Sequence, residues 1–89
     1  MAILYHTDDV HENVRPQADK FTLEELHQHL GGYAEIVCRI GRYILLKNEE
    51  GEAKALNVNF WFPWICGPVL AVHAGEITDE TLEAIGEGM

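Results

Sequence analysis

Histidines and acidic residues are the side chains of this chain that could bind a metal ion. Imidazole and carboxylate groups are common ligands of zinc and iron, and the five histidines are His6, His11, His27, His29 and His73. His27 and His29 are two residues apart on a predicted helix, about 200° around its axis, so they cannot both face one ion. The run from His6 to His11 is polar and typical of a solvated loop. The sequence therefore predicts neither a metal site nor a bound cofactor.

Nucleophilic chemistry has few candidate residues. Such an enzyme needs a serine or cysteine beside a base and an oxyanion-stabilising group, and the chain contains no serine. Cys38 lies inside a predicted strand and Cys66 follows an aromatic run, where packing as a buried thiol explains each better than activation does. The acidic pairs Glu24-Glu25 and Glu49-Glu50 fall in a helix start and a turn, where solvent-facing acids are common. We therefore expect a protein that is not an enzyme.

The most unusual motif is Phe60-Trp61-Phe62-Pro63-Trp64, which holds four of the eight aromatic residues. We call residues 60–64 the aromatic segment. If alternate residues point to opposite faces, Trp61 cannot share the core with its neighbours, and aromatic surface remains for a partner or for self-association. If Pro63 instead bends the chain over the sheet, the segment closes a small core. The sequence leaves both interpretations open.

Length and composition limit the class of protein. Eighty-nine residues form a single domain over residues 1–89, and 47% hydrophobic residues can build a small core without disulfides. A formal net charge of -9 argues against direct binding to nucleic acid or to an anionic membrane surface. The N-terminus shows no signal-peptide pattern, which predicts a cytoplasmic protein.

Charge is distributed unevenly along the chain. Both ends are acidic, whereas four of the six basic residues lie in the middle, namely Arg39, Arg42, Lys47 and Lys54. Residues 57–75 carry no formal charge. Because Pro63, Pro68 and His73 interrupt this stretch, it predicts buried strand and loop and not a membrane span.

Two short helices are predicted from the same start signal. Thr22 at an N-cap and Glu25 three residues later form a capping box, with Phe21 and Leu26 at the hydrophobic-staple positions. Leucines at helical spacing and a following Gly-Gly pair give a helix over residues 23–30.

The second helix starts in the same way. Thr78 is its predicted N-cap, with Ile77 and Leu82 at the staple positions and two acids near the positive end of the helix dipole. Gly86 is expected to end it.

The segment between the helices has the composition of strands. Residues 34–40 and 43–47 are rich in β-branched and other apolar side chains, and Gly41-Arg42 between them suits a type II′ hairpin turn. This pairing places Cys38 opposite Leu45.

Further strands complete a small sheet. After a second turn, residues 52–56 are expected to return as a third strand, with Glu52 facing Lys47. Residues 69–74 and 2–5 are the fourth and fifth candidates. The predicted fold class is α+β, a small antiparallel sheet made of a three-strand meander plus one or two further strands, with two short helices.

The order of several motifs resembles a known family. In chain order they are Phe21-Thr22-Leu23-Glu24-Glu25-Leu26, Leu30-Gly31-Gly32-Tyr33-Ala34-Glu35-Ile36-Val37, Asn48-Glu49-Glu50-Gly51, Leu56-Asn57-Val58-Asn59 and Ile65-Cys66-Gly67-Pro68-Val69-Leu70-Ala71-Val72. Over residues 19–75 the chain resembles a small domain family of unknown function encoded by bacteriophages, plasmids and other mobile elements of bacteria and archaea. The resemblance implies no activity and no catalytic residues. It implies an accessory protein in the host cytoplasm, where such proteins bind host or defence components.

Two hypotheses for the function come from different classes. The first is a non-catalytic protein-binding module that contacts a host protein, or a second copy of itself as a homodimer. Its candidate interface residues are Phe60, Trp61, Phe62, Trp64, Tyr33 and Asn59. The second is a binder of a nucleotide or metabolite, or a minor enzyme, with a pocket built from Tyr33, Asn57, Asn59 and His73. We prefer the first because no acid–base or nucleophile set is present.

Overall fold

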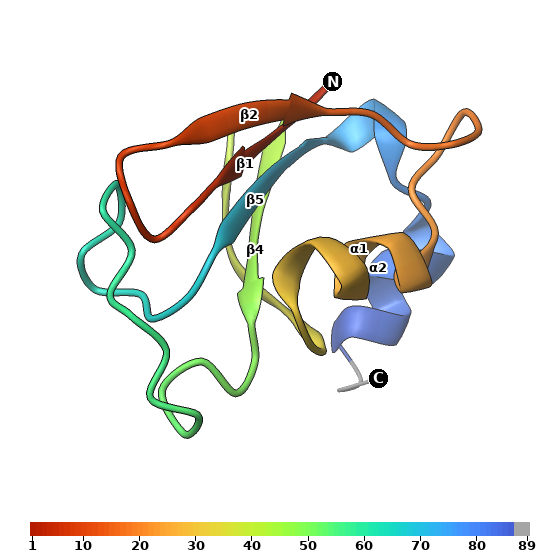
Figure 1. Cartoon of the computed structure of the whole chain (residues 1–89). Helices are drawn as coiled ribbons and strands as arrows, with labels where there is room; N and C mark the ends of the chain where they lie inside the picture. Colours follow the sequence, from red (N-terminus) through yellow and green to blue (C-terminus); the bar gives the residue numbers. More distant parts are fainter. Residues whose placement is uncertain (87–89) are drawn as a thin grey trace.

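This computed structural model describes residues 1–86. They fold into a five-stranded antiparallel sheet and two α-helices joined by turns and loops (Figure 1). The strands are β1 (Ala2–Tyr5), β2 (His11–Val14), β3 (Ala34–Ile40), β4 (Tyr43–Asn48) and β5 (Val69–His73). The helices are α1 (Leu23–Leu30) and α2 (Asp79–Gly86), and a 3-10 turn, η1 (Ala74–Glu76), precedes α2. The predicted α+β class is confirmed. No helix in the described residues is long and apolar enough to cross a membrane.

The strand order is β2-β1-β5-β4-β3, with every neighbouring pair antiparallel. A β1–β2 hairpin therefore joins a meander of β3, β4 and β5 through the pairing of β1 with β5. The hairpin turn at Gly41 has φ +59° at that glycine, as the first central position of a type II′ turn requires. The predicted pairing of Cys38 with Leu45 is confirmed.

Both helices cover one face of the sheet (Figure 1). Their apolar residues pack with alternate strand residues into the main core. The buried members are Ala2, Leu4, Val14, Phe21, Leu26, Leu30, Ala34, Ile44, Leu46, Leu70, Val72, Ile77 and Ile85. We call this the helix face, and the opposite side of the sheet the open face.

Helix α1 begins and ends as its sequence predicts. The Thr22 hydroxyl accepts from the Glu25 N–H at 3.1 Å, and the Glu25 carboxylate accepts from the Thr22 N–H at 3.0 Å. The backbone N–H groups of Thr22 and Gln17 hold the pKa of the Glu25 carboxyl below its usual 4.5, because both donate to the charged form. Gly31 then takes a left-handed conformation and ends the helix.

Helix α2 also has the expected start. The Thr78 hydroxyl accepts from the Thr81 N–H at 3.1 Å, and Ile77 is buried in the main core with Leu82 packed against it. Gly86 is the last residue described in this helix. Residues 87–89 lie outside the described part of the chain.

The predicted third strand at residues 52–56 is wrong. These residues form turns, with the Leu56 N–H donating to the Gly51 carbonyl and Ala55 at φ +53°. Lys47 pairs with β3 and β5 and not with Glu52. Alanine, lysine and glutamate favour strands poorly, so β5, whose first four residues are all apolar, takes the place beside β4.

Two smaller expectations are also wrong. His11 was expected in a loop but begins β2, an edge strand that only its pairing with β1 defines, because its one buried residue is Val14. Cys38 was expected to be buried but is exposed. It lies directly after an irregularity in β3, an edge strand with no neighbour on its outer side among the described residues.

Candidate protein-contact surface

Strand register fixes which side chains occupy the open face. Three rows cross the sheet at right angles to the strands. The first contains His11, Tyr5, Val69, Lys47 and Glu35; the second contains Asn13, Ile3, Ala71, Leu45 and Cys38; the third contains His73, Tyr43 and Ile40. No helix covers these rows. The segment that joins β4 to β5, green to cyan in Figure 1, lies on this side of the sheet.

A buried asparagine folds the aromatic segment. Asn59 is 0% exposed, and its Nδ2 donates to the carbonyls of Tyr5 and Gly67, both at 3.0 Å. Its Oδ1 accepts from the N–H groups of Trp61 at 2.9 Å and Phe62 at 3.1 Å. One side chain therefore satisfies four backbone groups and connects the segment to β1.

Short backbone pairing closes the base of the aromatic segment. Val58 and Cys66 form an antiparallel bridge, the Asn59 N–H donates to the Ile65 carbonyl at 2.7 Å, and the Gly67 N–H donates to the Asn57 carbonyl at 2.8 Å. Because the two ends are paired in this way, the five aromatic-segment residues form the tip of a closed loop.

The segment is divided between core and surface. Phe62 packs against a small second core on the open face, whose buried members are Leu45, Ile65, Val69 and Ala71. Three other side chains remain accessible: Phe60 is 58% exposed, Trp61 37% and Trp64 72%. Phe62 therefore helps to close the core, whereas Phe60, Trp61 and Trp64 leave aromatic surface exposed.

These exposed rings belong to a continuous aromatic cluster. Edge-on contacts join Trp61 to Phe60 at 5.2 Å and to His11 at 5.1 Å between ring centroids. Tyr5 contacts Trp61 at 5.7 Å and Phe62 at 5.3 Å, and Phe62 contacts Trp64 at 5.6 Å. Aromatic pairs in this geometry stabilise one another, so the rings form an ordered surface.

An apolar groove lies beside the aromatic segment. Its volume is about 330 Å³, and its lining residues are Ile3, Tyr5, Ile40, Tyr43, Leu45, Phe62 and Ala71. Ala71, between Ile3 and Leu45 in the second row, is the smallest side chain of the lining. At the far side Ile40 is 61% exposed and Tyr43 40% exposed. The groove and its far rim are therefore an exposed apolar surface.

The rows of the open face are almost free of acidic groups. Glu35 is their one carboxylate in the described residues, and it pairs in register with Lys47. Acidic groups instead lie in the β1–β2 turn, at Asp8 and Asp9, and in the helix layer. Arg42 lies in the β3–β4 turn, at the opposite end of the strands. The surface is therefore apolar in the centre, with opposite charges at two corners.

The candidate residues from the sequence do not all meet. Phe60, Trp61, Phe62 and Trp64 form the cluster. Asn59 cannot contact a partner directly, because it is fully buried, and acts by shaping the loop. Tyr33 is 54% exposed but lies at the end of α1, with its ring on His27 at 5.2 Å.

The proposed polar pocket is not assembled in this form. Asn59 is buried under the loop, and Tyr33 lies against α1 on the helix side. His73 is in the third row, where its ring contacts Tyr43 at 5.4 Å and its Nδ1 accepts from the Gly75 N–H. The groove that does exist is lined by apolar and aromatic residues from other positions.

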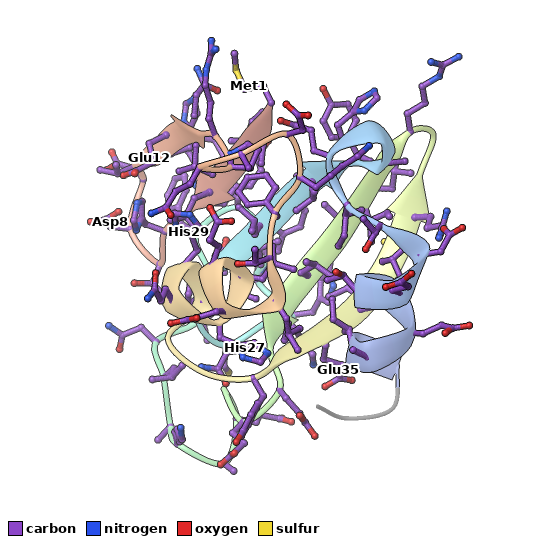
Figure 2. All side chains as sticks on the ribbon, turned by 90° about the vertical axis from the view of Figure 1, so that its right-hand side faces the viewer. Met1, Asp8, Glu12, His27, His29 and Glu35 are labelled. Atoms are coloured by element: carbon purple, nitrogen blue, oxygen red, sulfur yellow. The ribbon has the colours of Figure 1, made fainter. Side chains whose placement is uncertain are left out.

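Metal-ligating side chains are dispersed in the part of the chain that the structure describes. In residues 1–86 no three histidine, cysteine or acidic side chains lie close enough to hold a metal ion. The His6 Nε2 and Glu12 Oε2 atoms are 2.9 Å apart, an exposed hydrogen bond across the β1–β2 hairpin. Figure 2 shows Glu12 near Asp8 at the edge of the molecule. A second hollow, of about 500 Å³, is lined by Met1, Arg15, Pro16, Ala18, Asp19 and Glu76. This lining includes no serine, threonine, cysteine or histidine.

Several members of the surface were missed by sequence reasoning. Tyr5 and His11 join the aromatic segment only because β1 and β2 pair beneath it. Ile40 and Tyr43 flank the predicted hairpin turn, and their register opposite each other indicates a shared face. That signal was available in the sequence, but the position of the groove depends on β5 lying beside β4.

No protein-family model, curated protein or solved structure matches this chain.

Proposed function

We propose that this protein is a non-catalytic protein-binding module whose contact surface is the aromatic segment together with the adjoining groove. The observation that supports it is the ordered exposure of Phe60, Trp61 and Trp64 on a loop that a buried asparagine holds in place. Exposed tryptophans beside a pocket are the side chains that most often dominate binding energy at protein interfaces. Because the loop is already folded, little conformational entropy is lost on binding.

The setting is part of the same proposal. The motifs between residues 19 and 75 resemble a mobile-element family, so the partner we propose is a host or defence protein in the cytoplasm, or a second copy of the chain. Asp8 and Asp9 in the β1–β2 turn lie at one corner of the apolar centre, and Arg42 in the β3–β4 turn lies at the opposite corner. These charges favour partners that carry a basic and an acidic group at matching positions around an apolar patch, because complementary charge speeds encounter and excludes other proteins.

The test is native mass spectrometry of tagged protein captured from a bacterial lysate. Trp64→Ala should lose the bound partner and keep the same melting temperature, because its side chain is 72% exposed. Tyr33→Ala is the matched control, since this residue is an exposed aromatic side chain outside the cluster. Retention of the same partner by the wild type, by Trp64→Ala and by Tyr33→Ala would contradict the proposed surface.

The groove supports a second candidate, a binder of a small apolar metabolite. A volume of about 330 Å³ lies at the lower end of ligand pockets, and its lining is mainly apolar. A ligand of this kind should raise the melting temperature saturably and should be released on denaturation. Ala71→Leu, which fills the floor, should abolish that shift. A partner-free, ligand-free monomer that no small molecule stabilises would contradict this candidate.

A further inference from the structure

The open face is uneven in height. The aromatic segment protrudes on the side of β1 and β2, where its rings contact Tyr5 and His11. The groove lies beside it, across the middle of the sheet: residues of β1, β5, β4 and β3 line it, and it reaches the exposed Ile40 and Tyr43 on the far side. A protrusion and a hollow of similar chemistry thus occur on one face of one chain.

Opposite charges lie at two diagonally opposite corners of the open face. The β1–β2 turn follows Tyr5 in the first row and carries Asp8 and Asp9. The β3–β4 turn follows the third row and carries Arg42. Figure 2 shows Asp8 at the left edge, while the β3–β4 turn, yellow-green, is at the upper right. The acidic and basic corners are therefore at opposite ends of both the strands and the sheet.

Consider a two-fold axis that lies in the plane of the open face, along the diagonal between the two uncharged corners. Rotation about this axis places the acidic corner of one copy against the basic corner of a second copy. We propose that the partner of this surface is a second copy of the chain, in a symmetric face-to-face dimer. The aromatic segment of each copy fills the groove of the other, and Asp9 of each copy approaches Arg42 of the other. Because the axis lies diagonally, the two sheets cross at about 90°, which is one of the two common sheet-packing angles. The interface is isologous, as in most homodimers.

Electrostatics permits this dimer in spite of the net charge of -9. The three rows bring one carboxylate per copy into the interface, and Glu35 is already opposite Lys47. The other acids of the described residues lie in turns, edges and the helix layer, where charges separated by more than the Debye length, about 8 Å at physiological salt, are screened. A standard interface of about 800 Å² per partner would take about 15% of the 5369 Å² surface.

This inference rests on the proposed function, because it names the partner of the same surface. The test is the mass of the intact chain by sedimentation velocity, from low concentration to about 100 µM, a range that populates dimers of micromolar Kd. Asp9→Arg and Arg42→Asp are the key variants. Each one alone opposes like charges at both symmetric contacts and should weaken the dimer about tenfold. Mixed in equal amounts, they restore opposite charges at both contacts and should form a heterodimer with nearly the original affinity.

The mixture distinguishes this dimer from other outcomes. Both substitutions are at exposed turn residues, and circular dichroism checks that the variants fold. Restoration in the mixture supports the diagonal arrangement, while dimers that neither substitution weakens would overturn it. A wild-type chain that stays monomeric at about 100 µM overturns self-association altogether. In that case a host protein whose capture depends on Trp64 would still support the proposed function. If neither a dimer nor such a host protein is found, the proposed function is contradicted as well.

Discussion

The helix face of the sheet is fully covered, whereas the open face of the same sheet is covered only in part. On the helix face, Leu4, Leu46, Leu70 and Val72 alternate along three neighbouring strands, and each is at most 5% exposed beneath two capped helices. On the open face the equivalent side chains are fewer and smaller, and one loop covers only part of them. The first face supplies most of the folding energy, so the second is free to keep apolar surface for contact.

Each face also has its own buried polar side chain. Asn48 links β4 to α1, since its Nδ2 donates to the Leu30 carbonyl at 3.1 Å, while its Oδ1 accepts from the Glu50 N–H. Asn59 links the aromatic segment to β1. These are the two buried polar residues among residues 1–86. In both places a buried asparagine side chain, hydrogen-bonded to backbone groups, connects the sheet to the layer that covers it.

The largest effect is expected on the helix face. Leu70→Ala should lower the free energy of unfolding by about 2–5 kcal/mol, because the side chain is fully buried and leaves a cavity. Ile3→Ala, on the open face of the neighbouring strand, should cost clearly less because Ile3 is only half-buried. Urea unfolding of both variants measures the difference. Equal losses would show that the open face is as closed as the other.

Asn59→Ala should lower the free energy of unfolding by about 2–3 kcal/mol, because it leaves buried backbone groups without a partner. It should also release the tip of the loop. Thermal unfolding measures the first effect, and tryptophan fluorescence, with both tryptophans in the segment, measures the second. Asn48→Ala is the control, since it should destabilise the fold without changing the tryptophan signal. A fluorescence change of equal size in both variants would contradict a local role for Asn59.

The same substitution should have opposite signs on the two faces. Ala71→Val adds two methyl groups over the groove floor and should stabilise the fold by about 0.5–1 kcal/mol. Ala2→Val adds them to a site that is 0% exposed, so crowding should destabilise the fold by about 1 kcal/mol or more. Chemical denaturation of the pair compares them directly. Destabilisation by both would indicate that the hollow at Ala71 is not available.

The smallest effect concerns the helix cap and its acid sensitivity. Folding lowers the pKa of Glu25, so its contribution is present above pH 4.5 and is lost as the pH falls through the lower value of the folded state. Glu25→Gln keeps a capping side chain but cannot titrate. The variant should therefore lose less stability than the wild type between about pH 5 and pH 3. Parallel pH profiles would show that this carboxylate is not coupled to folding.

Local signals in the sequence were enough for the helices and the central hairpin. The capping box at Thr22, the glycines after residue 30 and Gly41 in its turn each determine the conformation of a few neighbouring residues. They are accurate because their physical cause lies within about four positions of the chain.

Longer connections could not be predicted in this way. Residues 52–56 have the length of a strand, yet they form turns, because alanine, lysine and glutamate favour strands poorly and β5 pairs with β4 instead. Gly51 before them packs so close to the Cys66 backbone that a Cβ there would collide with its carbonyl oxygen. Likewise, β2 depends on pairing with β1. The aromatic segment was recognised, but its division between Phe62 inside and Trp64 outside follows from the hydrogen bonds of Asn59, a residue the sequence marked only as a contact candidate.

The paired base of the aromatic segment has a consequence for how such a protein can diversify. The Val58–Cys66 bridge and its neighbouring hydrogen bonds hold the two ends of the loop independently of which rings occupy its tip. Substitutions at positions 60, 61 and 64 are therefore expected to change the exposed surface of the loop while the sheet remains unchanged. A library randomised at these three positions, with Asn59 and Phe62 retained, would use the domain as a small display scaffold.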